Sequence, residues 1–136
     1  MADFLPEFTE EELLQCAQAA YAPEKFSGDS PAPLTLQQNG ELNMYLLELW
    51  HGPTCAFKDM ALQMLPHLLT RSLQKTGTDK TAVILVATSG DTGKAAMEGF
   101  ADVPQTKILV FYPRDGVSEI QKLQMVTQEG ANVGVC

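Results

Sequence analysis

The residue with the clearest chemical potential is Lys58, which lies in the turn HGPTCAFKD (residues 51–59) at the start of a predicted helix. A lysine in this position faces the positive end of the helix dipole, which favours the neutral amine over the ammonium. A neutral lysine amine is the nucleophile that forms a Schiff base with a carbonyl compound. Two interpretations of Lys58 stay open on this basis, a reactive amine and an ordinary surface lysine.

A second candidate site is the turn of residues 88–93, which follows an apolar run and precedes a predicted helix. Ligands of parallel sheets bind at the carboxyl ends of the strands, and a helix start offers free N–H groups to an anion. The position therefore predicts an anion site. The alternative is that Ser89 and Asp91 only cap the helix.

Two nucleotide-binding motifs can be tested at the same turn. A phosphate loop of the form GxxxxGK[ST] fails, because Thr88 stands where the first glycine belongs and Ala95 where a magnesium-binding Ser or Thr belongs. No GxGxxG fingerprint is present either. We therefore do not predict a nucleotide site.

The elements that position both turns follow from the alternation of apolar runs and helical patterns. Apolar runs at 82–87, 107–112 and 131–135 are separated by helical patterns at 92–101 and 118–129. This β-α-β-α-β order predicts an α/β fold with a parallel sheet, right-handed crossovers and helices on both faces of the sheet.

Four segments are predicted before this unit. A capping box favours a helix over residues 9–21, and the Pro- and Gly-rich residues 23–40 favour a loop. A strand is predicted at 42–50. Apolar residues three or four apart predict a longer helix from 58 to 77, bent by Pro66.

Composition indicates a soluble globular chain, with 45% hydrophobic residues, 19% charged residues and no long apolar run in 136 residues. Residues 1–50 hold nine acids and one base, whereas residues 51–136 hold eight of each. This charge pattern speaks against a nucleic-acid partner, and no membrane segment is visible. We describe the chain as two regions, an amino-terminal helix, loop and strand (1–50) and the lysine helix with the βαβαβ unit (51–136).

The cysteines help to exclude other classes of protein. There are three, widely spaced and without a CxxC pair, so neither a disulfide framework nor a metal site is predicted. A reducing, cytoplasmic location fits this pattern best.

Together the two turns resemble the threonine synthase family, because HGPTCAFKD is followed about thirty residues later by VATSGDTGKAA (86–96). The resemblance runs from about Leu47 to the end of the chain and includes KILVFYPRDGVSEIQKLQ. Threonine synthases are pyridoxal 5'-phosphate enzymes of the tryptophan-synthase-like fold, also called fold type II. The resemblance thus implies the architecture that the pattern of elements predicts.

By this resemblance, Lys58 binds pyridoxal phosphate and moves protons among substrate carbons as general base and acid. The 89–93 turn receives the substrate carboxylate through Ser89, Gly90 and Thr92. Asp91 is expected to turn toward the cofactor ring oxygen, because a second carboxylate inside the loop would repel the first. The implied reaction converts O-phosphohomoserine and water to threonine and phosphate, with the cofactor as electron sink.

One arginine and the two histidines are further polar residues with a possible role near the site. Arg114, just after a predicted strand, is a candidate contact for the substrate because guanidinium binds phosphate with two bonds, although a surface role fits it equally well. His51 is expected to be structural in its turn, and His67 to lie on a helix surface.

The resemblance also implies that this chain is the amino-terminal portion of a longer enzyme. The glycine-rich loop for the cofactor phosphate and the group facing the pyridine nitrogen would lie beyond Cys136, so the chain alone is expected to be inactive. Two alternatives stay open. One is another enzyme of the same fold, a threonine dehydratase or a sulfhydrylase; the other is a non-catalytic domain that binds small anions or a partner protein.

Overall fold

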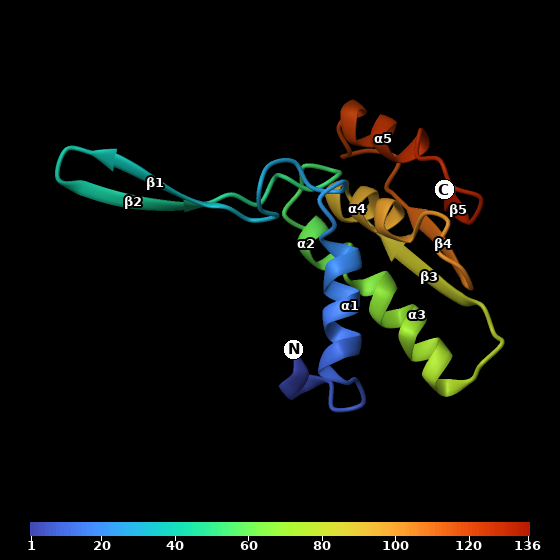
Figure 1. Ribbon diagram of the computed structural model, residues 1–136. Helices are drawn as coiled ribbons and strands as arrows, with labels where there is room; N and C mark the ends of the chain where they lie inside the picture. The colour runs from blue at the N-terminus through green and yellow to red at the C-terminus, as the bar shows by residue number, and fades with distance from the viewer.

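A computed structural model describes residues 1–136, and Figure 1 shows a body of helices and a sheet from which a hairpin projects. The helices are a short 3₁₀ helix η1 (Ala2–Phe4), α1 (Glu10–Ala20), α2 (Asp59–Leu62), α3 (Leu65–Thr76), α4 (Asp91–Phe100) and α5 (Glu119–Val126). The strands are β1 (Leu34–Asn39), β2 (Leu42–Leu47), β3 (Ala82–Ala87), β4 (Thr106–Phe111) and β5 (Val133–Val135). No helix is long and apolar enough to cross a membrane.

The predicted β-α-β-α-β unit is confirmed. Strands β3, β4 and β5 form a parallel sheet in that order, and α4 and α5 are the two crossover helices. The start of α5 carries a capping box in which Ser118 accepts from the Gln121 N–H and Gln121 accepts from the Ser118 N–H. Local signals therefore fix both the order and the limits of these elements.

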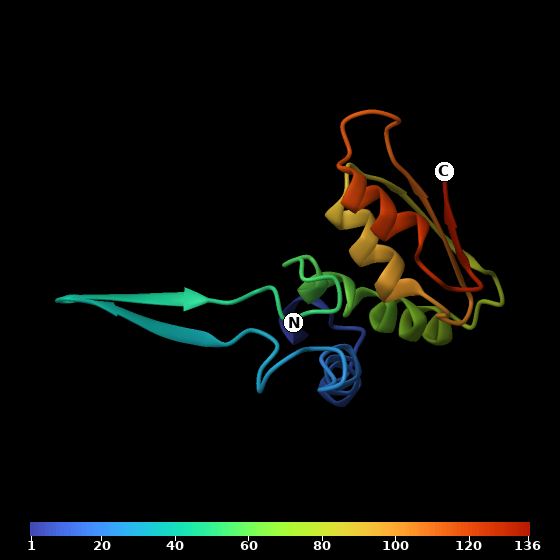
Figure 2. The same cartoon turned by 90° about the horizontal axis from the view of Figure 1, so that it is seen from above.

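The prediction that helices cover both faces of the sheet is wrong for this chain. Both crossover helices lie on the same side of the sheet (Figure 2), as expected when crossovers of one hand step twice in the same direction. Ile108 and Val110 are buried on that side. On the other side Val83 and Leu85 are 60% and 67% exposed, and Phe111 is exposed beside them. The second face is apolar but uncovered.

The main core lies between α4, α5 and the sheet. It consists of Ala96, Met97, Phe100, Ile108, Val110 and Met125. Small residues let α4 approach the sheet closely, since a methyl group at Gly93 would lie 2.3 Å from Thr88 Cγ2 and 3.0 Å from Val110 Cγ1. Helix α4 therefore packs closely on the sheet because residue 93 has no side chain.

A second, smaller core joins α1 to α3. The predicted capping box at the start of α1 is present, with Thr9 accepting from the Glu12 N–H and Glu12 accepting from the Thr9 N–H. Cys16 and Ala20 of α1 pack against Met64, next to α3. The Tyr21 hydroxyl donates to the carbonyl oxygen of Met60 at 2.6 Å, which ties the end of α1 to α2.

The single bent helix predicted from 58 to 77 is two helices, α2 and α3, separated at residues 63–64. Pro66 lies in the first turn of α3 and has no N–H to donate to the Leu62 carbonyl. Helix α4 crosses close to this carbonyl, because a methyl group at Gly99 would lie 2.2 Å from the Leu62 oxygen. The break therefore allows a backbone-to-backbone contact between α2 and α4.

The loop predicted over residues 23–40 is only partly a loop, because its end forms strand β1. β1 pairs with β2 in antiparallel register from Leu34↔Leu47 to Asn39↔Leu42, and Gly40, with φ of 63°, turns the chain between them. Glycine adopts this left-handed conformation readily. Figures 1 and 2 show the hairpin extending away from the body, which leaves its side chains largely exposed. The predicted strand at 42–50 ends at Leu47.

Candidate active site

Lys58 lies directly before α2, at the helix start where the sequence predicts it, and is half-buried. Its Nζ lies 4.3 Å from the centre of the Phe57 ring. None of the three ion pairs in the chain involves Lys58, and its side chain makes no hydrogen bond. The amine is therefore available to an incoming group.

The turn that carries Lys58 is held by the carboxylate of Asp59. This side chain is 1% exposed and accepts from the Thr54 N–H at 2.8 Å and from the Thr54 hydroxyl at 2.7 Å. Glycine is required opposite it, because a methyl group at Gly52 would lie 2.5 Å from Asp59 Cβ and Oδ2. The two ends of the 51–59 turn thus lock together and fix the position of Lys58 between them.

His51 connects the same turn to the base of the hairpin. Its Nε2 lies 2.7 Å from Glu48 Oε2 and its Nδ1 lies 3.1 Å from Ser27 Oγ. The bond from His51, with a second one from Thr35, holds the pKa of Glu48 below its ordinary value of 4.5. Trp50 stacks on the imidazole. This arrangement agrees with the structural role predicted for His51.

The 88–93 turn is organised by the Thr88 side chain. Its hydroxyl oxygen lies 3.2 Å from both the Gly90 and the Gly93 nitrogen and accepts from each N–H. The predicted alternative, capping by Ser89 or Asp91, is not seen, because the helix has no side-chain cap at its N-cap residue, Gly90. Thr88 instead satisfies these two amides from the end of β3.

Three amides of this turn stay free. The N–H groups of Ser89, Asp91 and Thr92 have no hydrogen-bond partner in the chain, whereas those of Gly93 and Lys94 bond to the Gly90 carbonyl. Free amides at the start of a ten-residue helix attract an anion through the helix dipole. The arrangement can bind a carboxylate or a phosphate.

The Asp91 carboxylate bonds to a residue of α5 and not to these amides. Its Oδ1 accepts from Gln121 Nε2 at 3.0 Å. Gln121 also lies against Gly90, where a methyl group would come within 2.5 Å of its amide nitrogen. The start of α5 thus packs directly on the turn and keeps the Asp91 carboxylate at the side of the site.

The remaining predicted residues lie further out. Arg114 is exposed in the loop after β4 and makes no hydrogen bond or ion pair. That loop and the 88–93 turn leave neighbouring strands at the same edge of the sheet, since the Thr88 N–H donates to the Phe111 carbonyl at 2.9 Å. No hydrogen bond or ion pair joins Lys58 to the turn, although α2 packs against α4. His67 is half-buried rather than on an open helix surface.

Sequence reasoning missed three residues that shape the site: Asp59, Thr88 and Gln121. Asp59 had a local signal in the sequence, because a carboxylate directly after a turn can accept hydrogen bonds from the N–H and hydroxyl groups of that turn. Thr88 had a local signal as well, because it is the first polar residue after the apolar run at 82–87. The contact between Gln121 and Asp91 had none, because it joins segments thirty residues apart.

Comparison with known proteins relates the chain to one group of enzymes. No protein-family model matches it. It is 49% identical to the threonine synthase of Pseudomonas aeruginosa over 108 residues, which is 79% of this chain and 22% of that protein. The crystal structure of yeast threonine synthase superposes with a TM-score of 0.84 at 35% identity, over 96% of this chain and 27% of that one.

A second solved structure gives the same result. The pyridoxal-phosphate-bound threonine synthase of Brucella melitensis superposes with a TM-score of 0.78 at 37% identity, covering 92% of this chain and 25% of that one. The chain therefore spans about a quarter of the length of the relatives that it matches.

Proposed function

The chain belongs to the threonine synthase family over the stretch that it spans, and from this premise we propose that it supplies the lysine and the carboxylate-binding turn of a threonine synthase active site. The protein that contains it would be a pyridoxal-phosphate-dependent lyase that converts O-phosphohomoserine and water to threonine and phosphate. Because the chain spans about a quarter of its relatives, catalysis would need the remaining length as well.

The observation that carries the proposal is that one chain presents an unpaired lysine amine and a turn with free amides, each at a helix start. The amine can bond covalently to a carbonyl group, and the amides can bind the carboxylate of an amino acid. An amino-acid substrate of a carbonyl cofactor needs both groups. The specific substrate and reaction are proposed from the sequence identity to threonine synthases and not from the geometry of these two groups.

The residues present fit pyridoxal phosphate in part. Lys58 has a primary amine, which is the group that bonds to the cofactor aldehyde, and no carboxylate lies within ion-pair distance of it. We place the anchor for the cofactor phosphate in the part of the relatives' length that this chain does not span. When bound, the cofactor would supply an electron sink for carbanions next to the amino group.

Each residue of the chain then has a distinct task. Lys58 would hold the cofactor, and its amine would accept and return protons at the substrate carbons. Ser89, Gly90 and Thr92 orient the substrate by binding its carboxylate, for which Ser89 and Thr92 provide free N–H groups. Asp91, kept aside by Gln121, stays out of that anion pocket and is available to the cofactor ring oxygen. Arg114, exposed in the loop after β4, is proposed as a contact for the substrate phosphate.

The test compares variants in a protein that carries this chain together with the remaining length of its relatives. Lys58→Ala should abolish both the visible absorption band of the bound cofactor and phosphate release from O-phosphohomoserine. Lys80→Ala, which changes an exposed lysine before β3, is the matched control and should retain both. A Lys58→Ala protein that keeps a cofactor reducible by borohydride would refute the assignment.

The isolated chain offers a second test. With added pyridoxal phosphate and O-phosphohomoserine it should release no phosphate above background, because half a site neither excludes water nor holds a substrate in a reactive geometry. Turnover by the isolated chain would contradict this part of the proposal. Threonine offered to the longer protein in place of O-phosphohomoserine would distinguish a dehydratase, which should release ammonia from it.

A further inference from the structure

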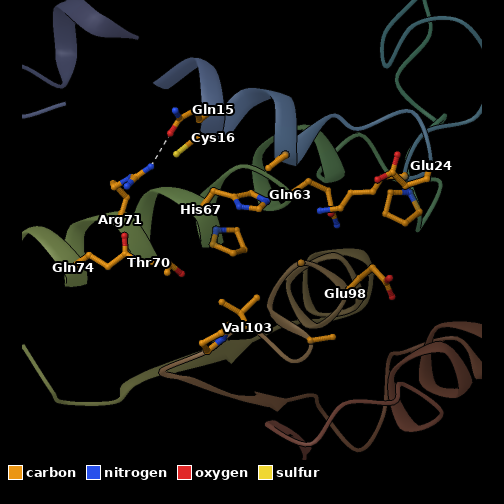
Figure 3. Close-up of a pocket in the computed structure, with 17 residues that line it drawn as sticks. Gln15, Cys16, Glu24, Gln63, His67, Thr70, Arg71, Gln74, Glu98 and Val103 are labelled. Atoms are coloured by element: carbon orange, nitrogen blue, oxygen red, sulfur yellow. Dashed lines mark hydrogen bonds between the residues drawn. The ribbon is translucent and has the colours of Figure 1, made fainter. Parts of the chain in front are cut away.

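The largest cavity of the chain, about 810 Å³, lies between α1, α3 and α4, apart from the two turns described above (Figure 3). Its walls hold charged side chains of both signs, Glu24 and Glu98 together with Lys25 and Arg71. Arg71 already donates to Gln15 at 2.9 Å, the bond that is dashed in Figure 3. This balance of charges favours no one class of ligand. The groups best placed for a further reaction lie instead at the tip of the β1–β2 hairpin.

The hairpin tip holds the one Asn-Gly sequence of the chain, Asn39 followed by Gly40. Asn39 is the last residue of β1, and Gly40 with Glu41 forms the loop before β2. A backbone nitrogen that attacks the side-chain amide carbon of the residue before it closes a five-membered ring, and such an intramolecular attack has a large entropic advantage. Glycine hinders this attack least, because it has no Cβ. The sequence thus places a nucleophile next to an electrophile.

Both reacting groups at the tip are free and open to water. Asn39 and Gly40 are exposed, and a Cβ placed on Gly40 would meet nothing within 4 Å. The Gly40 N–H donates to no acceptor, and the Asn39 side chain makes no hydrogen bond, unlike the neighbouring Asn43 amide. No hydrogen bond therefore has to break before these two groups react.

The other two asparagines of the chain lack these properties. Asn43 precedes a methionine, and its Oδ1 accepts from Gln38 at 3.3 Å. Asn132 is half-buried and precedes a β-branched valine. Its Nδ2 donates to the Phe100 carbonyl at 2.9 Å, and its Oδ1 accepts from the Asp102 N–H at 2.8 Å. Of the three asparagines, only Asn39 combines a free side chain with a following glycine.

Ring closure at Asn39 requires the hairpin tip to open. In an antiparallel strand, ψ of about +135° turns the following nitrogen away from the side chain. Strand β1 pairs only with β2, and the hairpin extends away from the body (Figures 1 and 2). A two-stranded hairpin on its own is only marginally stable, so its tip opens locally at a small cost in free energy. The hairpin thus supplies the opening that the reaction needs.

We propose that Asn39 is a site of spontaneous modification that consumes only water. The Gly40 nitrogen gives its proton to solvent and bonds to Asn39 Cγ, while the Cγ–Nδ2 bond breaks and ammonia leaves with a proton from solvent. Water then hydrolyses one of the two bonds from this nitrogen to a carbonyl carbon. Cleavage at Cγ gives aspartate, and cleavage at the backbone carbonyl gives isoaspartate. The site is independent of the proposed active site.

The two products differ in their effect on the hairpin. Each adds a negative charge at the tip. Isoaspartate also inserts a methylene group into the backbone at residue 39, whose partner across the hairpin is Leu42. The length of a hairpin loop sets the register of its strands, so isoaspartate should disrupt the β1–β2 pairing next to the tip. Aspartate leaves the backbone unchanged and should preserve it.

The first test follows the mass of the hairpin peptide after the 136-residue chain is incubated at neutral and at mildly alkaline pH. The peptide should gain the mass difference between an NH2 and an OH group, and fragment ions should place the gain at Asn39. The gain should be faster at the higher pH, because more of the Gly40 nitrogen is deprotonated. Asn39→Gln should prevent it, since the longer side chain closes a ring less easily. Asn43→Gln is the matched control and should leave the rate unchanged.

The second test measures amide hydrogen exchange in the hairpin after the two products are separated. The isoaspartate form should lose protection in β1 and β2 next to the tip. The Asn39→Asp chain is the control, because it adds the same charge without the extra backbone atom and should keep its protection. An isoaspartate form as protected as this control would refute the effect on strand register.

Two results would overturn the assignment of the site itself. One is an Asn39 that stays intact in the folded chain over a period in which a free peptide of the hairpin sequence is fully converted, since the tip would then not open. The other is a mass gain that appears equally fast at Asn43 or Asn132, or that persists in the Asn39→Gln chain.

Discussion

Asp59→Asn probes the lock that holds the lysine turn. The substitution keeps the size of the side chain but replaces one acceptor oxygen with an NH2 group. The remaining oxygen can still accept from the Thr54 N–H (2.8 Å), and the NH2 group can donate to the Thr54 hydroxyl (2.7 Å), but neither bond then has a charged acceptor. A hydrogen bond to a charged acceptor contributes about 1.5–3 kcal/mol. Neutral hydrogen bonds contribute about 0.5–1.5 kcal/mol each, and relief of the buried charge offsets part of the loss. We expect a net loss of about 1–2 kcal/mol in the free energy of unfolding.

The assay is thermal unfolding of the 136-residue chain followed by circular dichroism. Its unfolding entropy is about 0.3 kcal/mol/K for this length, so the melting temperature should fall by about 3–7 °C. Thr54→Val is the matched control, because it removes only the hydroxyl donor and keeps the backbone N–H. Its melting temperature should fall as well, because one bond to the carboxylate is lost. An Asp59→Asn chain that melts within about 2 °C of the unchanged chain would show that the carboxylate does not hold the turn.

Three further substitutions test other contacts. Gly99→Ala places a methyl group 2.2 Å from the Leu62 oxygen and should destabilise the chain by about 1–3 kcal/mol in urea unfolding; an unchanged midpoint would mean that α2 and α4 can separate freely. Thr88→Val removes the acceptor for two amides and should cost about 1 kcal/mol, with faster amide exchange in the turn, while Thr88→Ser keeps the hydroxyl and both properties. Because the folded-state pKa of Glu48 lies below 4.5, its bond to His51 stabilises the fold above that pH and is lost as the pH falls through the lowered pKa. Glu48→Gln should therefore reduce stability near pH 7 and have little effect well below pH 4.5; equal effects at both pH values would refute this linkage.

The elements that the sequence predicts correctly are those with a strong local signal. The strand at 82–87 is a continuous apolar run between turn residues, and the capping boxes at Thr9 and Ser118 lie within single turns. For the same reason the helix starts near Lys58 and Asp91 are where the sequence places them. Their chemical roles stay predictions, because no contact in the chain tests them.

Features that depend on distant contacts were predicted less well. The hairpin strand at 34–39 has both faces exposed, so it lacks the alternation of apolar and polar residues that identifies a half-buried strand. A proline in the first turn of a new helix and a proline that bends a continuous one give the same local signal, which explains the missed break before Pro66. Pairing of Asp91 with Gln121 depends on where two helices dock, and no local pattern contains that information.

The projecting hairpin of β1 and β2 also determines the size of the chain in solution. A compact domain of 136 residues has a radius of gyration of about 14 Å. Mass placed far from the centre counts by the square of its distance, so an extended arm raises this value more than its share of the residues. Small-angle scattering therefore measures the position of the arm directly: a chain with the arm held away scatters as an elongated particle, and one with the arm folded onto its body scatters as a sphere.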